Sequence, residues 1–223
     1  MRHTNLTNES AEYVKAREEL RLAEIELMRH RERVAQQRRD LPPGPALPNY
    51  VLRDGDGPVA FEELVTDRPL IVYHLMYGKK NTVPCPMCTM WIDGFNGVAQ
   101  HIARNVDFAV VAAAEPDDLQ RYGRERGWDQ LRLLSAGDST FKLDLRSEDE
   151  DGNQDSTVSV FARDPQGAIR HHYTAHPRMG EDIQERGIDL LAPVWHLLDL
   201  SPAGRGDWYA GLDYGRLVSG SRT

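Results

Sequence analysis

The residues best suited to chemistry in this sequence stand in one short motif. The chain has 223 residues but only two cysteines, Cys85 and Cys88, which bracket the segment Cys-Pro-Met-Cys. In a reducing compartment such a close pair is seldom a structural disulfide, and redox exchange or metal binding is the usual reason for it. The spacing therefore predicts a redox-active dithiol, and with it a thiol-disulfide oxidoreductase.

The neighbouring residues favour a reactive sulfur at Cys85. Helices tolerate proline best in their first turn, so Pro86 predicts that a helix begins at Cys85, where unpaired backbone N–H groups favour a thiolate. Two of the four lysines, Lys79 and Lys80, precede the motif, and their charge would favour a thiolate further. We assign Cys85 as the attacking thiolate and Cys88 as the thiol that resolves the mixed disulfide.

Alternating strands and helices are predicted to position this motif. An apolar run over residues 70–77 is typical of a buried strand, and it leads into the motif and a helix over residues 89–104. Other strands are predicted at 106–114, 131–134, 157–163 and 168–173, with helices at 117–126 and 181–198. This order predicts an α/β protein, with a thioredoxin-like mixed β-sheet flanked by helices.

Four regions are predicted along the chain: an N-terminal helical extension (1–40), a proline-rich linker (41–49), a thioredoxin-like domain (50–200) and a C-terminal tail (201–223). The domain opens with a hairpin over residues 50–60 and a short helix over residues 61–65.

The two ends of the chain carry the expected contact surfaces. A helix over residues 8–40, capped by Asn8 or Ser10, has an apolar stripe that repeats every seven residues. This stripe would pack on the body of the chain or form a homodimer through the N-terminal helix. Near the other end, Trp208, Tyr209 and Tyr214 would cover the domain or a dimer contact.

The composition excludes several classes of partner. Hydrophobic residues make up 40% of the chain, charged residues 28%, and the formal net charge is -8. A chain this acidic, without a local basic patch, is not expected to bind nucleic acid or an anionic membrane. No segment approaches the roughly 20 apolar residues of a membrane span, and the N-terminus has no apolar signal core. We expect a cytoplasmic protein that needs no cofactor and acts on a protein or small-molecule disulfide.

The residues around the dithiol also resemble a known family. The runs Ile71–Gly78 and Cys85–Phe95, together with Val158–Phe161 and Leu198–Arg205, are similar to a bacterial thioredoxin-like family catalogued as domain of unknown function 899. Its members are often labelled predicted dithiol-disulfide oxidoreductases. The resemblance covers most of residues 10–206, and it implies a thioredoxin-like fold and disulfide exchange.

A thiol peroxidase that uses the same Cys85 is an alternative within this class. Thioredoxins carry a cis-proline before the strand predicted here at residues 157–163, but the preceding segment of this chain has no proline. Peroxiredoxins also lack that proline, and Thr82 matches the Thr-x-x-Cys half of their motif. In a peroxidase Thr82 would orient the peroxide, and an arginine such as Arg163 would stabilise the leaving oxygen.

Other roles stay open for the histidines and the cysteines. Two thiolates can supply half of the ligands of a tetrahedral zinc site, and His171 with His176 would supply the other half. The chain would then be a non-catalytic metal-binding or interaction protein. Their separation from the cysteines is far outside zinc-finger spacing, so we assign no metal ligands. His74, in the predicted central strand, is either a proton acceptor near the dithiol or a satisfied core histidine. If the two cysteines take part in neither redox exchange nor metal binding, Cys85 and Cys88 are an inert buried pair.

Overall fold

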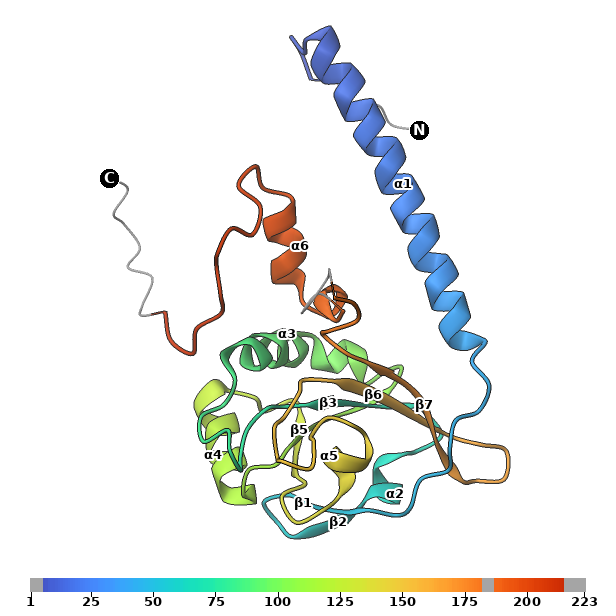
Figure 1. Cartoon of the computed structure of the whole chain (residues 1–223), viewed down its shortest axis with the longest axis vertical. Helices are drawn as coiled ribbons and strands as arrows, with labels where there is room; N and C mark the ends of the chain where they lie inside the picture. Colours follow the sequence, from blue (N-terminus) through green and yellow to red (C-terminus); the bar gives the residue numbers. More distant parts are fainter. Residues whose placement is uncertain (1–5, 182–186, 215–223) are drawn as a thin grey trace. The chain divides into compact units, whose positions relative to one another are not determined.

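The chain forms two compact units that divide between Pro42 and Pro43 in the computed structural model. The structure describes residues 6–181 and 187–214. The first unit consists mainly of helix α1 (Ala11–Arg39), and the second contains the β-sheet and the other helices (Figure 1). The positions of the two units relative to each other are not defined, so each is described by itself.

Local interactions stabilise helix α1. Ser10 caps it, since its hydroxyl accepts a hydrogen bond from the backbone N–H of Tyr13 at 3.1 Å, as one of the two predicted caps would. Along the helix, charged pairs such as Glu18 and Arg21 join residues three apart. Such exposed pairs each contribute only a few tenths of a kcal/mol, about 0.2–0.5. The homodimer through this helix stays a prediction.

A seven-stranded mixed sheet forms the centre of the second unit, with the strand order β2-β1-β5-β4-β3-β6-β7. The central strand β3 pairs in parallel with β4 and antiparallel with β6. The strands are β1 (Val51–Arg53), β2 (Pro58–Ala60), β3 (Leu70–His74), β4 (Asp107–Ala112), β5 (Arg132–Ser135), β6 (Val158–Arg163) and β7 (Ile169–Ala175).

Helices cover both faces of this sheet (Figure 1). One hydrophobic core joins the sheet to α3, α4 and α6, and a second core joins its other face to α2 and α5. The helices are α2 (Phe61–Leu64), α3 (Pro86–Ile102), α4 (Pro116–Arg126), α5 (Phe141–Asp144) and α6 (Pro193–Asp199), with a 3₁₀ helix, η1, at Asp189–Leu191. The fold is therefore the predicted thioredoxin-like α/β fold. In the part of the chain that the structure describes, no helix has the length and apolar character needed to cross a bilayer.

The pleat of β3 decides which of its side chains face the dithiol helix. Successive residues of a strand point to opposite faces of a sheet. Tyr73 belongs to the core that contains α3, and its ring lies 5.4 Å from that of Phe95. Val72 belongs to the opposite core, and His74 stacks on Phe141 there with the ring centroids 5.6 Å apart. The strand thus places Tyr73, and not His74, on the side of the dithiol.

Two predicted elements differ from the structure. The strand predicted over residues 70–77 ends at His74, which is the last residue of β3 to pair with β4, opposite Val111. The single helix predicted over residues 181–198 is wrong in its described part, where η1 precedes α6. Pro193 cannot continue a helix and restricts the residue before it, so Ala192 is extended, with φ -121° and ψ 120°. Residues 182–186 of that prediction lie outside the described residues.

The loop between β3 and α3 depends on a glycine. Gly78 has φ +91°, and a Cβ built on it would lie 2.1 Å from the backbone nitrogen of Ala114. We expect Gly78→Ala to lower the free energy of unfolding by about 2 kcal/mol or more, since backbone strain and a clash add together. Urea unfolding monitored by circular dichroism measures this.

Gly97 supplies the matched control. It lies within α3, and a Cβ built on it meets nothing within 4 Å. Gly97→Ala is therefore expected to stabilise the protein by up to about 1 kcal/mol, through helix propensity alone. A Gly78→Ala protein as stable as the wild type would contradict the close approach of this loop to β4.

Candidate active site

Cys85 stands at the start of α3, as predicted. Its backbone is extended, with φ -61° and ψ 124°, and the helix begins with Pro86. The Cys85 sulfur accepts the backbone N–H of Cys88 at 3.5 Å, so it caps the first turn. The backbone N–H of Cys85 donates to the carbonyl of Met76 at 3.1 Å, which ties the residue to the end of the central strand. A sulfur in this position faces the positive end of the helix dipole, which favours a thiolate.

Cys88 lies one turn further along α3 and is fully buried, whereas Cys85 is only half-buried. Burial raises the pKa of the Cys88 thiol well above its usual value, and the neighbouring Cys85 raises it further. The backbone N–H of Met76 and the hydroxyl of Tyr73 act in the opposite direction and lower the pKa of Cys88. The two sulfurs therefore have different environments, one open and one closed.

Tyr73 is a site residue that sequence reasoning missed. Its side chain is fully buried, and its hydroxyl has no hydrogen-bond partner at standard distances in the described part of the chain. Burial raises the pKa of Tyr73 well above its usual value, and the charge of Cys88 raises it further. The phenol thus keeps its proton and can donate to the Cys88 sulfur. Its position, one residue before the end of β3, carries no sequence signal for this role.

Lys142 is a second residue without an obvious sequence signal. It belongs to α5 and is almost completely buried, at 1% exposure. Its ammonium group lies 3.5 Å from the carbonyl oxygen of Leu75. Burial lowers its pKa to about 8, and the strongest opposing influence is the negative charge of Cys88. Lys142 therefore places a titratable positive charge behind the dithiol.

His74 does not reach the cysteines. Its Nδ1 lies 2.9 Å from the Ser147 hydroxyl and its Nε2 lies 3.1 Å from the Ser159 hydroxyl, on the face of the sheet opposite α3. Burial lowers the pKa of His74 well below its usual value, so the ring is neutral. The structure therefore supports the core-histidine interpretation and not the proton acceptor near the dithiol.

The two lysines before the motif bind another loop. Lys79 forms an ion pair with the buried carboxylate of Glu148, and the Lys80 ammonium lies 3.4 Å from the side-chain oxygen of Asn153. Neither lysine lines the cavity at Cys85. No direct contact therefore supports the expected stabilisation of the Cys85 thiolate by these two lysines. They instead bind the loop around residues 148–153.

The residues expected to assist a peroxidase do not gather at Cys85. Thr82 is exposed and lines a different cavity, together with Tyr77 and Asp118. Arg163 ends β6, which runs antiparallel to β3, so it lies at the opposite end of β3 from the dithiol. Its guanidinium donates to backbone carbonyls there, including those of Val65 and Glu62.

A cavity of about 380 Å³ opens beside Cys85. Besides Cys85, six of its lining residues are aromatic or sulfur-containing and come from distant parts of the chain: Met76, Met87, Trp91, Trp195, Trp208 and Tyr209. Four charged residues also line it, as two ion pairs, Asp155 with Arg178 and Asp189 with Arg205. Arg178 carried no signal in the sequence, and Arg205 stood out only as the last residue of a run that resembles the family. Trp208 and Tyr209 stood out only as residues that would cover the domain or a dimer contact.

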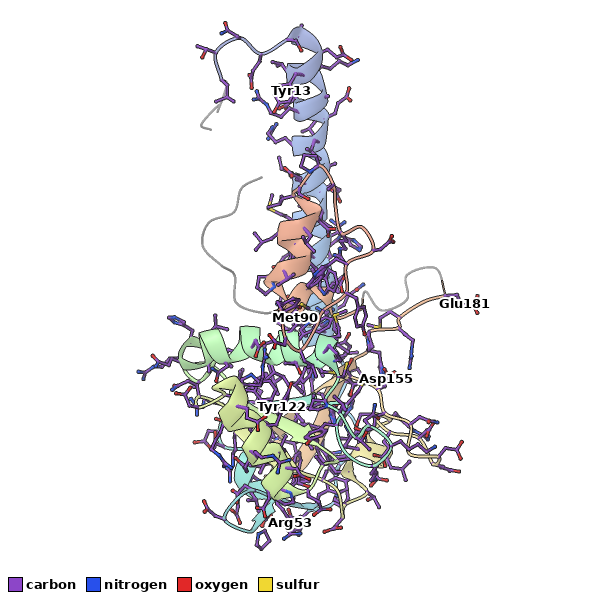
Figure 2. All side chains as sticks on the ribbon, turned by 90° about the vertical axis from the view of Figure 1, so that its left-hand side faces the viewer. Tyr13, Arg53, Met90, Tyr122, Asp155 and Glu181 are labelled. Atoms are coloured by element: carbon purple, nitrogen blue, oxygen red, sulfur yellow. The ribbon has the colours of Figure 1, made fainter. Side chains whose placement is uncertain are left out.

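The region around α3 is anchored on the side away from this cavity. The hydroxyl of Thr89 lies 2.9 Å from that of the half-buried Tyr122, which lies below Met90 in the view of Figure 2. Asp93 accepts hydrogen bonds from Arg126 and from the indole N–H of Trp128. These contacts fix α3 on α4, so the position of the dithiol depends on two helices and a strand.

The predicted alternative of a zinc site has no support in the geometry. Within residues 6–181 and 187–214, no group of three or more His, Cys, Asp or Glu side chains is arranged to hold a metal ion. His171 instead bonds through Nε2 to the Thr174 hydroxyl at 2.7 Å. The two cysteines and the two histidines of that alternative therefore do not form one site.

Comparison with models of protein families shows which family this chain belongs to. Residues 2–217 match the family model described as "Bacterial protein of unknown function (DUF899)". The chain belongs to the DUF899 family. This confirms the resemblance drawn from the runs around the dithiol. No curated protein matches the sequence.

Solved structures similar to this DUF899 protein include peroxiredoxins. Reduced Prx3 from Vibrio vulnificus in complex with H2O2 is 17% identical, with a TM-score of 0.46, over 68% of this chain and 96% of that chain. Peroxiredoxin 5 from Alvinella pompejana is 13% identical, with a TM-score of 0.49, over 68% of this chain and 97% of the other. Peroxidoxin BcpB from Mycobacterium tuberculosis is 16% identical, with a TM-score of 0.47, over 67% and 92%. Similarity this low transfers no activity, so the function is inferred below from the residues themselves.

The different burial of the two sulfurs predicts selective alkylation. Cys85 is half-buried beside the cavity, whereas Cys88 is fully buried. Iodoacetamide is therefore expected to modify native protein once, at Cys85, and to reach Cys88 only after unfolding in guanidinium chloride. Peptide mass mapping locates the adduct. Modification of Cys88 before Cys85 in native protein would contradict the described geometry.

The buried Lys142 predicts an unusual dependence of stability on pH. Its pKa is about 8 in the folded chain and 10.5 in the unfolded chain, so the unfolded state binds more protons between these values and stability rises with pH there. The gain amounts to about 3 kcal/mol of unfolding free energy, from 1.36 kcal/mol per pKa unit. Lys142→Met is expected to remove this rise.

Urea unfolding at several pH values between 7 and 10.5 measures the effect as the difference between wild type and variant. Buried groups that do not interact with Lys142 titrate alike in both proteins, so they cancel in this difference. Lys80→Met, at an exposed lysine, is the control and is expected to follow the wild type. Equal pH slopes for wild type and Lys142→Met would contradict the burial of a titrating ammonium group.

Proposed function

We propose that this DUF899 protein is a thiol-disulfide oxidoreductase that uses Cys85 and Cys88. One observation carries the proposal. The Cys85 sulfur caps α3 beside an open cavity and accepts the backbone N–H of Cys88 at 3.5 Å. Cys88 follows one helical turn later and is buried in the core. One accessible sulfur and one protected sulfur, one helical turn apart, are what attack and resolution require.

The reaction would proceed in two displacements. The Cys85 thiolate attacks one sulfur of a substrate disulfide, so a Cys85–substrate disulfide forms and one substrate thiolate leaves. Cys88, after losing its proton, then attacks the Cys85 sulfur and releases the second substrate thiolate. The substrate gains two electrons and the protein loses two, becoming a Cys85–Cys88 disulfide. A dithiol reductant returns the protein to its starting state, and the reverse direction oxidises such a dithiol.

The pKa of Cys88 supports this order of events. Cys85 is one of the groups that raise the pKa of Cys88, so Cys88 holds its proton while Cys85 is a thiolate. Formation of the mixed disulfide removes the negative charge from Cys85 and lowers the pKa of Cys88. The Tyr73 hydroxyl and the Met76 backbone N–H, which favour the Cys88 thiolate, then act on the second step.

A thiol peroxidase would use the same sulfur, and it stays the alternative proposal. The Cys85 thiolate would attack one oxygen of a peroxide, so a sulfenic acid forms and an alcohol or water leaves. Cys88 would then attack the Cys85 sulfur, so the disulfide forms and the sulfenic oxygen leaves as water. Neither Thr82 nor Arg163 lines the cavity at Cys85, so the two residues expected to assist a peroxidase do not support this alternative. Hydrogen peroxide therefore belongs in the test as a second oxidant.

Single-turnover reactions of the reduced protein with bis(2-hydroxyethyl) disulfide test the proposal. Wild type is expected to release two thiols per chain and to form an internal disulfide. Cys88→Ser is expected to stop at the mixed disulfide after releasing one thiol, and Cys85→Ser to react at least about a hundredfold more slowly, because Cys88 is buried. Released thiol is measured by absorbance, and the protein product by intact mass.

Val98→Ala provides a control on the same helix, since Val98 is exposed and does not line the cavity. It is expected to react like the wild type. Disulfide turnover by Cys85→Ser at the wild-type rate would refute the proposal. Rapid oxidation of Cys85 by hydrogen peroxide, with no reaction toward the disulfide, would refute it in favour of the peroxidase.

A further inference from the structure

The cavity at Cys85 is bordered by a row of tryptophan rings. Trp91 lies on the dithiol helix α3, Trp195 lies on α6, and Trp208 follows in the C-terminal segment. The ring centroids of Trp91 and Trp195 are 6.5 Å apart, and those of Trp195 and Trp208 are 5.4 Å apart in an edge-to-face arrangement. Trp91 and Trp195 are buried, while Trp208 is 39% exposed. The row thus leads from the dithiol helix to the surface.

Among the described residues that line the cavity, every charged side chain has an ion-pair partner. Arg178 bonds to Asp155 at 2.6 Å. Arg205 forms ion pairs with Asp189 and, at 2.7 Å, with Asp199, and its guanidinium lies 4.8 Å from the centre of the Trp195 ring. The charged lining residues therefore neutralise one another. An ionic substrate would gain little there, because each arginine already has its carboxylate.

Two methionines line the cavity together with Cys85, alongside the uncharged polar side chains of Gln154 and Ser156. Met76 comes from the loop after β3 and Met87 from the first turn of α3. Thioethers adapt to irregular shapes and make favourable contacts with aromatic rings. The volume of about 380 Å³ lies toward the lower end of the range for small-molecule pockets, which is about 300–1,000 Å³. It suits one small molecule with a ring or a comparable apolar group.

We propose that the substrate of Cys85 is a small disulfide that carries an aromatic or similarly bulky apolar substituent. This inference rests on the proposed function and adds the substrate class to it. One sulfur of the substrate faces Cys85, and its ring packs against the tryptophan row near Trp208. The protein dithiol supplies both electrons, the substrate leaves as two thiols, and no further reactant takes part.

Alkylation by two reagents with the same reactive group tests the cavity without any redox step. The rate of Cys85 modification by N-phenyliodoacetamide, divided by the rate with iodoacetamide, is compared with the same ratio for free cysteine. The wild-type ratio is expected to exceed that of free cysteine about tenfold. Trp208→Ala is expected to lower it about three- to tenfold, the value of one aromatic contact, and Trp208→Phe is expected to restore most of it.

Leu197→Ala is the matched control, since Leu197 is an exposed apolar residue of α6 that does not line the cavity. Its ratio is expected to equal that of the wild type. Iodoacetamide alone should modify all four proteins at similar rates, which shows that the variants are folded around an intact Cys85. A wild-type ratio no larger than that of free cysteine, or one insensitive to Trp208→Ala, would overturn the inference.

Turnover of disulfides separates this inference from the proposed function. Rates with neutral bis(4-pyridyl) disulfide, with bis(2-hydroxyethyl) disulfide and with anionic glutathione disulfide are each divided by the rate of the same disulfide with 2-mercaptoethanol. We expect the aromatic disulfide to be preferred about tenfold. Equal normalised rates would overturn the substrate class and leave the oxidoreductase intact. No reaction with any disulfide, despite an aromatic preference in alkylation, would refute the oxidoreductase and leave the aromatic site intact.

Discussion

The first turn of α3 contains backbone N–H groups that no carbonyl within the helix can satisfy, and the site depends on how these groups are used. Here the Cys85 sulfur accepts the N–H of Cys88, and Pro86 has no N–H to satisfy. The bond from the Cys85 N–H to the Met76 carbonyl fixes this turn against the end of β3. The same backbone geometry thus places one sulfur at a positively polarised helix end and buries the second sulfur behind it.

The buried polar groups lie on the two faces of the sheet, and they have different roles there: those on one face lie near the dithiol, and those on the other stabilise the core. On the face of α3, the buried Tyr73 hydroxyl can donate to the Cys88 sulfur, and this interaction lowers the pKa of Cys88. On the other face, His74 is held by Ser147 and Ser159 and stays neutral, so it stabilises the core. Lys142 belongs to a helix of that second face, yet it is influenced by Cys88. It is therefore the group through which the two faces are electrostatically coupled.

Reactivity and recognition arise from different parts of the chain. The sulfur and its helix belong to the β3–α3–β4 unit, whereas Trp195, Arg205 and Trp208 come from the C-terminal segment. Arg205 joins η1 to the end of α6 through Asp189 and Asp199, and it packs on Trp195, so it fixes the wall of the cavity. A change in that wall can alter which substituent is accepted without moving the backbone that activates the sulfur.

Features that depend on neighbours a few residues apart could be predicted from the sequence. The start of α3 at Pro86, the Ser10 cap of α1 and most strands followed from local propensity, and the runs around the dithiol identified the family. Only the tertiary structure decided which distant side chains meet. It separated His74 from Cys85 and brought Arg205 and Trp208 to the cavity instead of Arg163. The physical reason is that helix starts and strands are set by short-range backbone sterics and hydrogen bonds. The composition of a cavity is set by packing between elements whose order in space the sequence pattern does not contain.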